Sequence, residues 1–422
     1  MKDVIAAKPG PVGEVPEGWS KTKVAHIASI ITGPFGTLLK ASEYGGAEGV
    51  PLISVGEVRE GFLRVTDETP TVSQSVTKRL PQYLLREGDV VFGRKGGVER
   101  SAIIKDFQAG WFLGSDGISI RLKDGYHRPF FGQAFRSGTV QSWLLQNASG
   151  TTMPSLNQAI LGAVEIPFPN DPKEQEAIAE ALSDADALIE GLERLIAKKR
   201  LIKQGAMQDL LTAKRRLPGF SGEWVDTPLG EIGPFVGGGT PSMARADFWK
   251  DGTIPWVSSS DIRIGELHSA DRMITVDAVK GSSTRVVGPG SILFVTRSGI
   301  LRRFQPVMIN TVPVAINQDI KALLPRSSEY SAVYVFHAAV GAGDQILRDC
   351  MKTGTTVESI DLTALRRFCV SCPKERDEQD AIATVLTDID AEIQALNTRL
   401  EKARQVKEGM MQNLLTGRIR LV

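Results

Sequence analysis

The chain has 422 residues, a hydrophobic share of 42% that is ordinary for a globular protein, and a formal net charge of only +1. This length is enough for two or three domains with their own cores, and the charge gives no support to a histone-like protein that binds nucleic acid through a general excess of cations. The sequence has no run of 18 apolar residues and no apolar signal-peptide core near residue 1, so we expect a cytoplasmic protein without a membrane span.

The sequence predicts an N-terminal arm followed by a globular segment in the first part of the chain. Residues 1–16 are rich in proline and glycine, which predicts an extended N-terminal arm. Residues 17–164 form the first predicted domain, with a helix expected at Phe130–Gln146. Short runs typical of β-strands lie at Val50–Val55, Asp89–Phe92, Ser101–Ile104 and Ile118–Leu122.

A long helical stretch follows at 165–217 and occurs a second time at 369–422. Aligned without a gap, 175–217 and 379–421 are identical at 21 positions. Both copies carry apolar residues at alternating spacings of four and three, which predicts two coiled-coil helices of about 40 residues. The residues of this predicted helix-pair interface are Ile178, Leu182, Ile189, Leu192 and Ile196 in the first copy, and Ile382, Leu386, Ile389, Ile393, Leu396 and Leu400 in the second.

The ends and charges of these helices carry further information. Asp171 is the expected N-cap, Pro172 the first helical residue and Glu174 the partner in a capping box. Each copy is acidic in its first half and basic in its second, so an antiparallel pair would bring opposite charges together. The alternative is two solvated helices that each pack on their own domain.

The second globular segment, 218–368, parallels the first. Trp224 corresponds to Trp19, IPWVSSSDIRIG at 254–265 corresponds to VPLISVGEVREG at 50–61, and GTTVESID at 354–361 corresponds to GTTMPSLN at 150–157. Between these shared stretches the two segments have little in common. We therefore predict a mixed α/β fold with an internal pseudo-two-fold repeat, in which two globular domains are separated by an antiparallel pair of long helices.

These ordered features resemble the specificity (S) subunit of type I restriction–modification systems. The resemblance rests on GGTPS at 238–242, the two GTT boxes, EQ-x-AIA at the start of each helix, and MQ-D/N-LLT near each helix end at 207–212 and 411–416. The first domain departs from the pattern, with ITGPFGTLLKASEY at 31–44 in place of GGTPS.

The resemblance implies a non-catalytic subunit whose two target-recognition domains each read half of a bipartite, asymmetric DNA target. The helix pair would set the spacing and dock two methyltransferase (M) subunits. Restriction/translocase (R) subunits complete such an assembly on double-stranded DNA, and the partners would use S-adenosylmethionine, ATP and Mg. For this chain we expect no cofactor, metal or catalytic residue of its own.

The residues themselves agree with that expectation. We find no N/D-P-P-F/Y/W motif of an adenine methyltransferase and no G-x-x-x-x-G-K-S/T phosphate loop. Cys369 and Cys372 have the C-x-x-C spacing of half a zinc site, but the sequence has no second cysteine or histidine pair to complete it. We therefore expect both cysteines to pack in the core.

Candidate DNA contacts lie in glycine-bearing turns, where backbone amides can approach phosphate and arginine can read guanine. An ordinary hairpin with solvated cations is an equally good interpretation of each turn, and a bivalent protein-binding scaffold without nucleic acid is the alternative for the whole chain. The candidates are Arg94, Lys95, Gly96, Gly97, Arg100, Gly239, Thr240, Ser242, Arg245, Ser259, Arg297, Ser298, Arg302 and Arg303.

Overall fold

The computed structural model describes residues 15–45, 49–150, 153–352 and 357–421, so most of the predicted arm at 1–16 lies outside the described residues. The chain divides into two compact units. Unit 1 comprises Met1–Leu192 and Arg399–Val422, and unit 2 comprises Glu193–Thr398. Each unit therefore holds one globular part together with part of each long helix.

The globular part of unit 1 is built on three small sheets, with strand orders β2-β8-β5-β6, β4-β3-β7 and β1-β9. Its strands are β1 (Trp19–Lys23), β2 (Ala28–Thr32), β3 (Val50–Ile53), β4 (Thr71–Val72), β5 (Val90–Gly93), β6 (Ser101–Ile103), β7 (Phe112–Leu113), β8 (Gly117–Leu122) and β9 (Glu165–Pro169). Its helices are α1 (Val24–Ile27), α2 (Gln74–Arg79), α3 (Arg128–Phe135), α4 (Gly138–Asn147) and α5 (Gln158–Ala163), with 3₁₀ turns at Ala41–Glu43, Pro81–Tyr83 and Asp106–Gln108.

Unit 2 repeats this plan, with strand orders β11-β19-β16-β17-β13, β14-β12-β18-β15 and β10-β20. Its strands are β10 (Trp224–Pro228), β11 (Phe235–Gly237), β12 (Ile254–Val257), β13 (Ile264–Leu267), β14 (Arg272–Ile274), β15 (Arg285–Val287), β16 (Ile292–Val295), β17 (Val307–Asn310), β18 (Val314–Ile316), β19 (Ile320–Leu323) and β20 (Cys369–Pro373). Its helices are α7 (Leu229–Ile232), α8 (Val276–Lys280), α9 (Ala332–Gly341), α10 (Gly343–Cys350) and α11 (Leu362–Arg367), with 3₁₀ turns at Ala246–Phe248 and Gly299–Arg302.

In each unit the central strand is apolar along its whole length because both faces of its sheet are covered. In β5, Val90 and Phe92 face the main core while Val91 faces a second cluster. In β16, Phe294 faces the main core and Leu293 faces the second cluster. Alternate residues of a strand point to opposite faces, so an unbroken apolar run fits a strand buried on both sides.

The two long helices are α6 (Pro172–Leu210) and α12 (Arg376–Leu414), each of 39 residues. Asp171 caps α6 as predicted, because its Oδ1 accepts a hydrogen bond from the Lys173 amide at 2.9 Å. Both helices have close to the predicted length of about 40 residues, and a residue in the left-handed region follows each of them: Ala213 at φ 55° and Gly417 at φ 70°. A left-handed residue after the last turn ends a helix by redirecting the chain.

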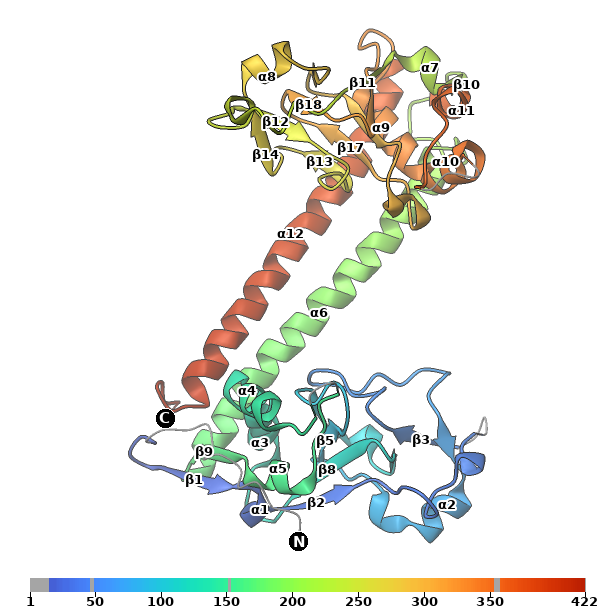
Figure 1. The fold of residues 1–422 in the computed structure, drawn as a ribbon. Coiled ribbons are helices and arrows are strands. Elements are labelled where there is room, and N and C mark those ends of the chain that lie inside the picture. The colour runs from blue at the N-terminus through green and yellow to red at the C-terminus, as the bar shows by residue number, and fades with distance from the viewer. Residues whose placement is uncertain (1–14, 46–48, 151–152, 353–356, 422) are drawn as a thin grey trace. The chain divides into compact units, whose positions relative to one another are not determined.

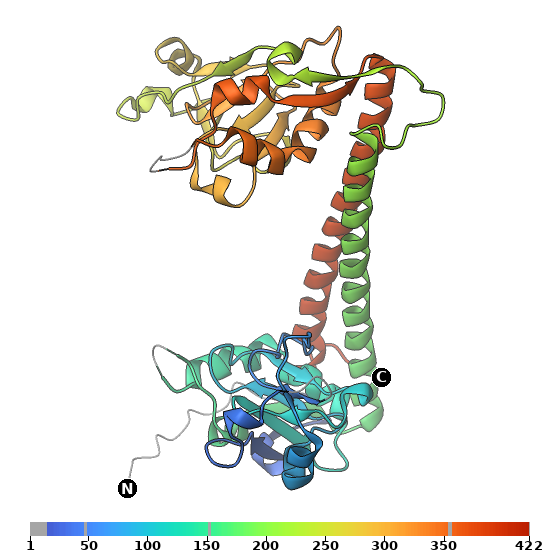
Figure 2. The same cartoon turned by 90° about the vertical axis from the view of Figure 1, so that its right-hand side faces the viewer.

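The predicted antiparallel pairing is confirmed within each unit. In unit 1, Lys407 Nζ of α12 lies 2.5 Å from Asp186 Oδ1 of α6. In unit 2, Lys203 pairs with Asp390 at 2.6 Å, and Lys199 pairs with Glu392. As the residue number rises along α6, it falls along α12, and Figures 1 and 2 show the two helices side by side within each unit.

The predicted interface residues are buried to different degrees. Buried residues are Ile178, Leu182, Leu192, Ile196, Ile382, Leu386 and Leu400, and half-buried residues are Ile189, Ile389, Ile393 and Leu396. The residues nearest the helix starts join the globular cores. Ile178 and Leu182 lie in one cluster with Leu414 near the end of α12, and Ile382 and Leu386 lie in one cluster with Leu210 near the end of α6.

A buried carboxylate at the start of each helix binds an arginine that follows the end of the other helix. Glu378 of α12 is fully buried and accepts hydrogen bonds from Arg216 Nε and Nη2 at 2.6 and 2.7 Å. Glu174 of α6 is 1% exposed, and its two carboxylate oxygens accept hydrogen bonds from Nε and Nη2 of Arg420, in the same bidentate geometry. The interpretation of Glu174 as a capping-box residue is therefore wrong, because its carboxylate is turned toward Arg420. We call these two pairs the end clamps.

Two further expectations need correction. The single helix predicted at Phe130–Gln146 is two helices, because Ser137 interrupts it and caps α4 by accepting a hydrogen bond from the Val140 amide at 3.4 Å. Of the two cysteines expected in the core, Cys372 is buried. Cys369, the first residue of β20, is exposed.

Removing the cation of an end clamp should cost far more stability than removing an exposed one. Arg216→Ala leaves the Glu378 carboxylate buried without its partner, which should lower the free energy of unfolding by about 3 kcal/mol. The matched control is Lys199→Ala, whose partner Glu392 is 55% exposed and whose loss should cost about 0–1 kcal/mol. Urea unfolding followed by circular dichroism measures both, and equal losses would contradict the proposed role of burial.

Acid sensitivity should depend on Asp186. Burial alone raises the pKa of Asp186, but Arg136, Gln133 and Lys407 outweigh burial and lower it from 3.8 to about 2. Because the folded-state pKa is the lower one, the carboxylate stabilises the folded chain above pH 3.8, and this contribution is lost as the pH falls toward 2.

The substitution Asp186→Asn should therefore flatten the decline of stability over this pH window, by about 1–2 kcal/mol once partial exposure is allowed for. Urea midpoints measured from pH 5 down to pH 2 test this. A variant that loses stability with acid as steeply as the unsubstituted chain would refute it.

Candidate nucleic-acid interface

In each unit the glycine-bearing turn after the central strand is fixed to the later part of the GTT box, at 154–156 or 358–360, while 151–152 and 354–356 of the boxes lie outside the described residues. In unit 1, Leu156 N donates to Arg94 O at 2.8 Å and Gly96 N donates to Pro154 O at 3.0 Å. Lys95 and Ser155 thereby form an isolated β-bridge. Two stretches that the sequence singled out separately thus form one surface feature.

Unit 2 has the same arrangement, residue for residue. Ile360 N donates to Thr296 O at 2.8 Å and Ser298 N donates to Glu358 O at 3.1 Å. Here the isolated bridge joins Arg297 and Ser359. Lys95 and Arg297 therefore occupy equivalent positions, and both side chains are exposed. Arg94 differs, since its guanidinium lies over the Phe35 ring, 5.7 Å from the centroid.

A third segment, which is not among the candidates predicted from the sequence, also contacts the strand-exit turn in each unit. It is the loop between β7 and β8 in unit 1, Gly114–Asp116, and between β18 and β19 in unit 2, Asn317–Asp319, which we call the hub loop. Arg94 N donates to Asp116 O at 2.7 Å, and Thr296 N donates to Asp319 O at 2.8 Å. A comparison of GSDG at 114–117 with NQDI at 317–320 could have revealed it, but the shared aspartate alone is a weak signal.

The hub loop of unit 2 also receives the glycine-rich segment Gly238–Ser242. Gly239 N donates to Ile316 O at 3.1 Å, and Thr240 Oγ1 donates to Gln318 Oε1 at 2.8 Å. A Cβ on Gly238 would lie 1.8 Å from Ile316 O, so only glycine fits there. The structure thus brings Gly239, Thr240 and Arg297 to one surface around the hub loop.

The serine-rich turn at 258–261 is held by its own carboxylate. Asp261 Oδ2 accepts hydrogen bonds from Ser258 N at 2.8 Å and from Ser258 Oγ at 2.6 Å. In unit 1, Glu57 Oε2 accepts from Ser54 N at 2.9 Å in the same manner. These contacts make the turn a structural element of both domains, and the candidate Ser259 lies within it.

Several candidate arginines bind partners within their own unit. Arg100 lies 3.5 Å from Glu99, and Arg302 pairs with Glu358. Arg245 pairs with Asp247 and lies 4.2 Å from the Phe248 ring centroid. Their guanidinium groups are therefore less available for a ligand than that of Arg303, which is exposed.

The remaining candidates shape the backbone of these loops. Gly96 has φ +78° in the left-handed region, and a Cβ on Gly97 would collide with the Arg100 guanidinium. Ser298 caps the 3₁₀ turn at Gly299–Arg302 by accepting from the Ile300 amide at 3.4 Å. The carbonyl of Ser242 accepts from Trp249 Nε1 at 3.1 Å.

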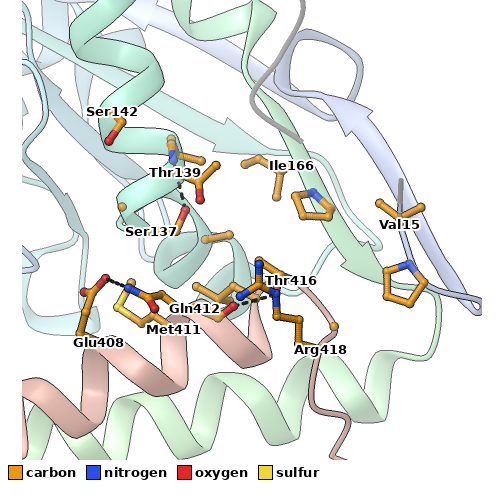
Figure 3. A pocket seen from close by; sticks show the side chains of 17 residues that line it. Val15, Ser137, Thr139, Ser142, Ile166, Glu408, Met411, Gln412, Thr416 and Arg418 are labelled. Atoms are coloured by element: carbon orange, nitrogen blue, oxygen red, sulfur yellow. Dashed lines mark hydrogen bonds between the residues drawn. The ribbon is translucent and has the colours of Figure 1, made fainter. Parts of the chain in front are cut away.

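A cavity of about 930 Å³ lies elsewhere in unit 1. It is bordered by the start of α4, by Ile166 and Pro167 of β9 and by the last turns of α12 (Figure 3). Its rim includes a hydrogen bond from Gln412 Nε2 to Glu408 Oε1 at 3.0 Å. None of the candidate DNA residues lines this cavity.

In the described part of the chain, no group of three or more His, Cys, Asp or Glu side chains is placed to hold a metal ion. Among the described residues, no helix is both long enough and apolar enough to cross a bilayer.

Comparison with known proteins places both halves of the chain in one family. The family model for the type I restriction modification DNA specificity domain matches residues 16–198 and again 221–405. The chain is 32% identical, over 249 residues, to the EcoR124I/EcoR124II specificity subunit of Escherichia coli, a match that covers 58% of this chain and 60% of that relative. It is 22% identical, over 433 residues, to the MjaVIII specificity subunit of Methanocaldococcus jannaschii, covering 96% of this chain and 94% of that one.

The fold is also similar to solved structures. The S subunit of a type I restriction–modification system from M. genitalium matches with a TM-score of 0.63 at 16% identity, over 96% of this chain and 99% of that one. A chain from a structural study of complex assembly and conformational transition in the type I system matches with a TM-score of 0.55 at 16% identity, over 97% and 100% of the two chains. At this level of identity the likeness concerns the fold alone.

Proposed function

Because the chain belongs to the family of type I restriction–modification specificity subunits, we propose that each of its globular domains reads one half of a bipartite, asymmetric DNA target. The target-recognition domains would be residues 17–164 and 218–368. The observation that carries this proposal is the repeated surface of GTT box, strand-exit turn and hub loop. Its backbone hydrogen bonds are the same in both units, while the exposed side chains differ.

Lys95 and Arg297 are proposed to contact the DNA backbone or a guanine at equivalent points of the two half-sites. Both are exposed and stand on a backbone fixed from two sides, by the GTT box and by the hub loop. Cations on a rigid frame fix the register of a protein on a duplex. The chain's net charge of +1 leaves much of the phosphate contact to partner subunits.

The helix pair is proposed to set the distance between the half-sites and to dock two methyltransferase subunits. Helix α6 begins in unit 1 and ends in unit 2, and 39 residues give it a length of about 59 Å. Leu188, Leu195 and Leu201 are 46%, 40% and 69% exposed on this helix. Exposed leucines along an otherwise charged helix favour a partner surface.

The cofactors and the location follow from this assembly. S-adenosylmethionine would be bound by the methyltransferase subunits, and ATP and Mg²⁺ by the restriction subunits, so this chain would act without a cofactor of its own. We propose a cytoplasmic location for the assembly, because its proposed ligand is double-stranded DNA. The alternative, a bivalent protein scaffold, predicts no DNA binding at all.

A binding titration separates the two functions. The chain, purified with its methyltransferase subunits, should bind duplexes that carry the motif it methylates in cells, as revealed by sequencing of methylated adenine. Binding should be at least about a thousandfold tighter than to unrelated DNA. Equal affinity for both duplexes, or no methylated motif in cells, would refute the proposal.

The spacing role predicts that lengthening both helices lengthens the gap between half-sites. Four residues inserted after Ile196 and four after Asn397 would keep the opposed charges in register while adding about 6 Å and about 40° of rotation. One to two base pairs add about 3–7 Å and about 34–68° of twist. The methylated motif should therefore gain one or two unspecified base pairs, with both halves unchanged.

The matched control inserts the same four residues at the exposed turn beside Gly125, outside the helices. This variant should keep the original gap. An active helix variant with the original gap would show that the helices do not set the spacing.

A further inference from the structure

The hub loop of unit 2 presents one side chain in a geometry suited to a particular base. We propose that Gln318 reads an adenine in the major groove of the half-site bound by the second domain. This assignment rests on the proposed function and adds to it a specificity-determining residue outside the sequence-based candidates.

The loop that carries Gln318 is held in place on either side of it. Asn317 N donates to Val257 O at 3.0 Å, and Asp319 O accepts from Thr296 N at 2.8 Å and from Thr296 Oγ1 at 3.0 Å. Lys321 Nζ donates to the carbonyl of Gln318 itself at 2.9 Å. A side chain on a backbone fixed in this way pays little ordering cost when it meets a ligand.

The amide of Gln318 is oriented although its side chain is exposed. Its Oε1 accepts from Thr240 Oγ1 at 2.8 Å, and its Nε2 donates to Asp319 Oδ2 at 3.2 Å. A glutamine amide has two acceptor sites and two donor hydrogens. One acceptor site of Oε1 and one N–H of Nε2 therefore remain for an external partner.

That remaining pair matches the major-groove edge of adenine. Adenine presents a donor at N6 next to an acceptor at N7, which a glutamine amide binds with two hydrogen bonds. Guanine presents two acceptors, O6 and N7, so the oxygen of the amide would face an acceptor. The contacts of Thr240 and Asp319 define which end of the amide is the acceptor and thus favour adenine over guanine.

The equivalent position in the first domain carries a different side chain on the same frame. Gly114 N donates to Ile53 O at 2.7 Å, as Asn317 N does to Val257 O, and Arg94 N donates to Asp116 O as Thr296 N does to Asp319 O. Ser115 therefore stands where Gln318 stands. A shared backbone with unlike side chains is the expected arrangement for two domains that read different sequences.

The test uses the chain in complex with its methyltransferase subunits and duplexes carrying the methylated motif. Each adenine of the motif is replaced in turn by 7-deazaadenine, which keeps Watson–Crick pairing but has a C–H group in place of N7. At one adenine of the motif, this replacement should weaken binding of the unsubstituted chain by roughly tenfold or more. At the same adenine, it should hardly change binding of the Gln318→Ala variant.

Two further variants sharpen the result. Gln318→Glu replaces the donor with an acceptor of the same shape, so it should lose preference for adenine at that position and accept a cytosine, whose N4 is a donor. Thr240→Val removes the hydroxyl that orients the amide and should relax the same position to a smaller extent. Gln345→Ala, at an exposed glutamine of α10, is the matched control and should bind like the unsubstituted chain.

The outcomes distinguish this assignment from the proposed function. If no adenine loses its N7 sensitivity in Gln318→Ala, or if the methylated motif of Gln318→Glu is unchanged, the assignment of Gln318 is wrong while sequence-specific binding stands. If the unsubstituted complex binds no defined motif, the proposed function itself fails.

Discussion

The end clamps are the interaction on which the pairing of the long helices within each unit depends. A carboxylate with 0% or 1% exposure is strongly unfavourable unless a cation reaches it. For Glu378 that cation is Arg216, and for Glu174 it is Arg420 near the end of the chain. Each clamp brings the end of one long helix to the start of the other, so within its own unit the two helices must run antiparallel.

The two units have equivalent backbone hydrogen bonds in their loops, but different side chains at the exposed positions proposed to contact DNA. The bridges of Lys95 with Ser155 and of Arg297 with Ser359 are equivalent, as are the carboxylate-held turns at 54–57 and 258–261. Side chains that project from this frame are unlike, as Ser115 and Gln318 illustrate. Hydrogen bonds between backbone groups do not depend on side-chain identity, which leaves the exposed positions free to vary.

The errors of the sequence analysis have a common physical cause. Glu174 fits a capping box by spacing, but a spacing rule does not include an arginine that lies more than two hundred residues further along the chain. The hub loops were overlooked because their role consists of carbonyl and amide contacts, such as Thr296 with Asp319, that leave little trace in composition. The helix expected at Phe130–Gln146 was interrupted by Ser137, whose hydroxyl competes for a backbone amide.

The sequence by itself determined the repeat, the two long helices and their antiparallel sense, because periodic apolar residues and ordered charges act through local geometry and simple electrostatics. It also determined the family, through boxes that keep their order along the chain. Only the tertiary structure decided which boxes meet, that Lys95 and not Arg94 is the counterpart of Arg297, and that Gln318 stands oriented between Thr240 and Asp319. Those relations depend on contacts between residues distant in sequence, which no local pattern specifies.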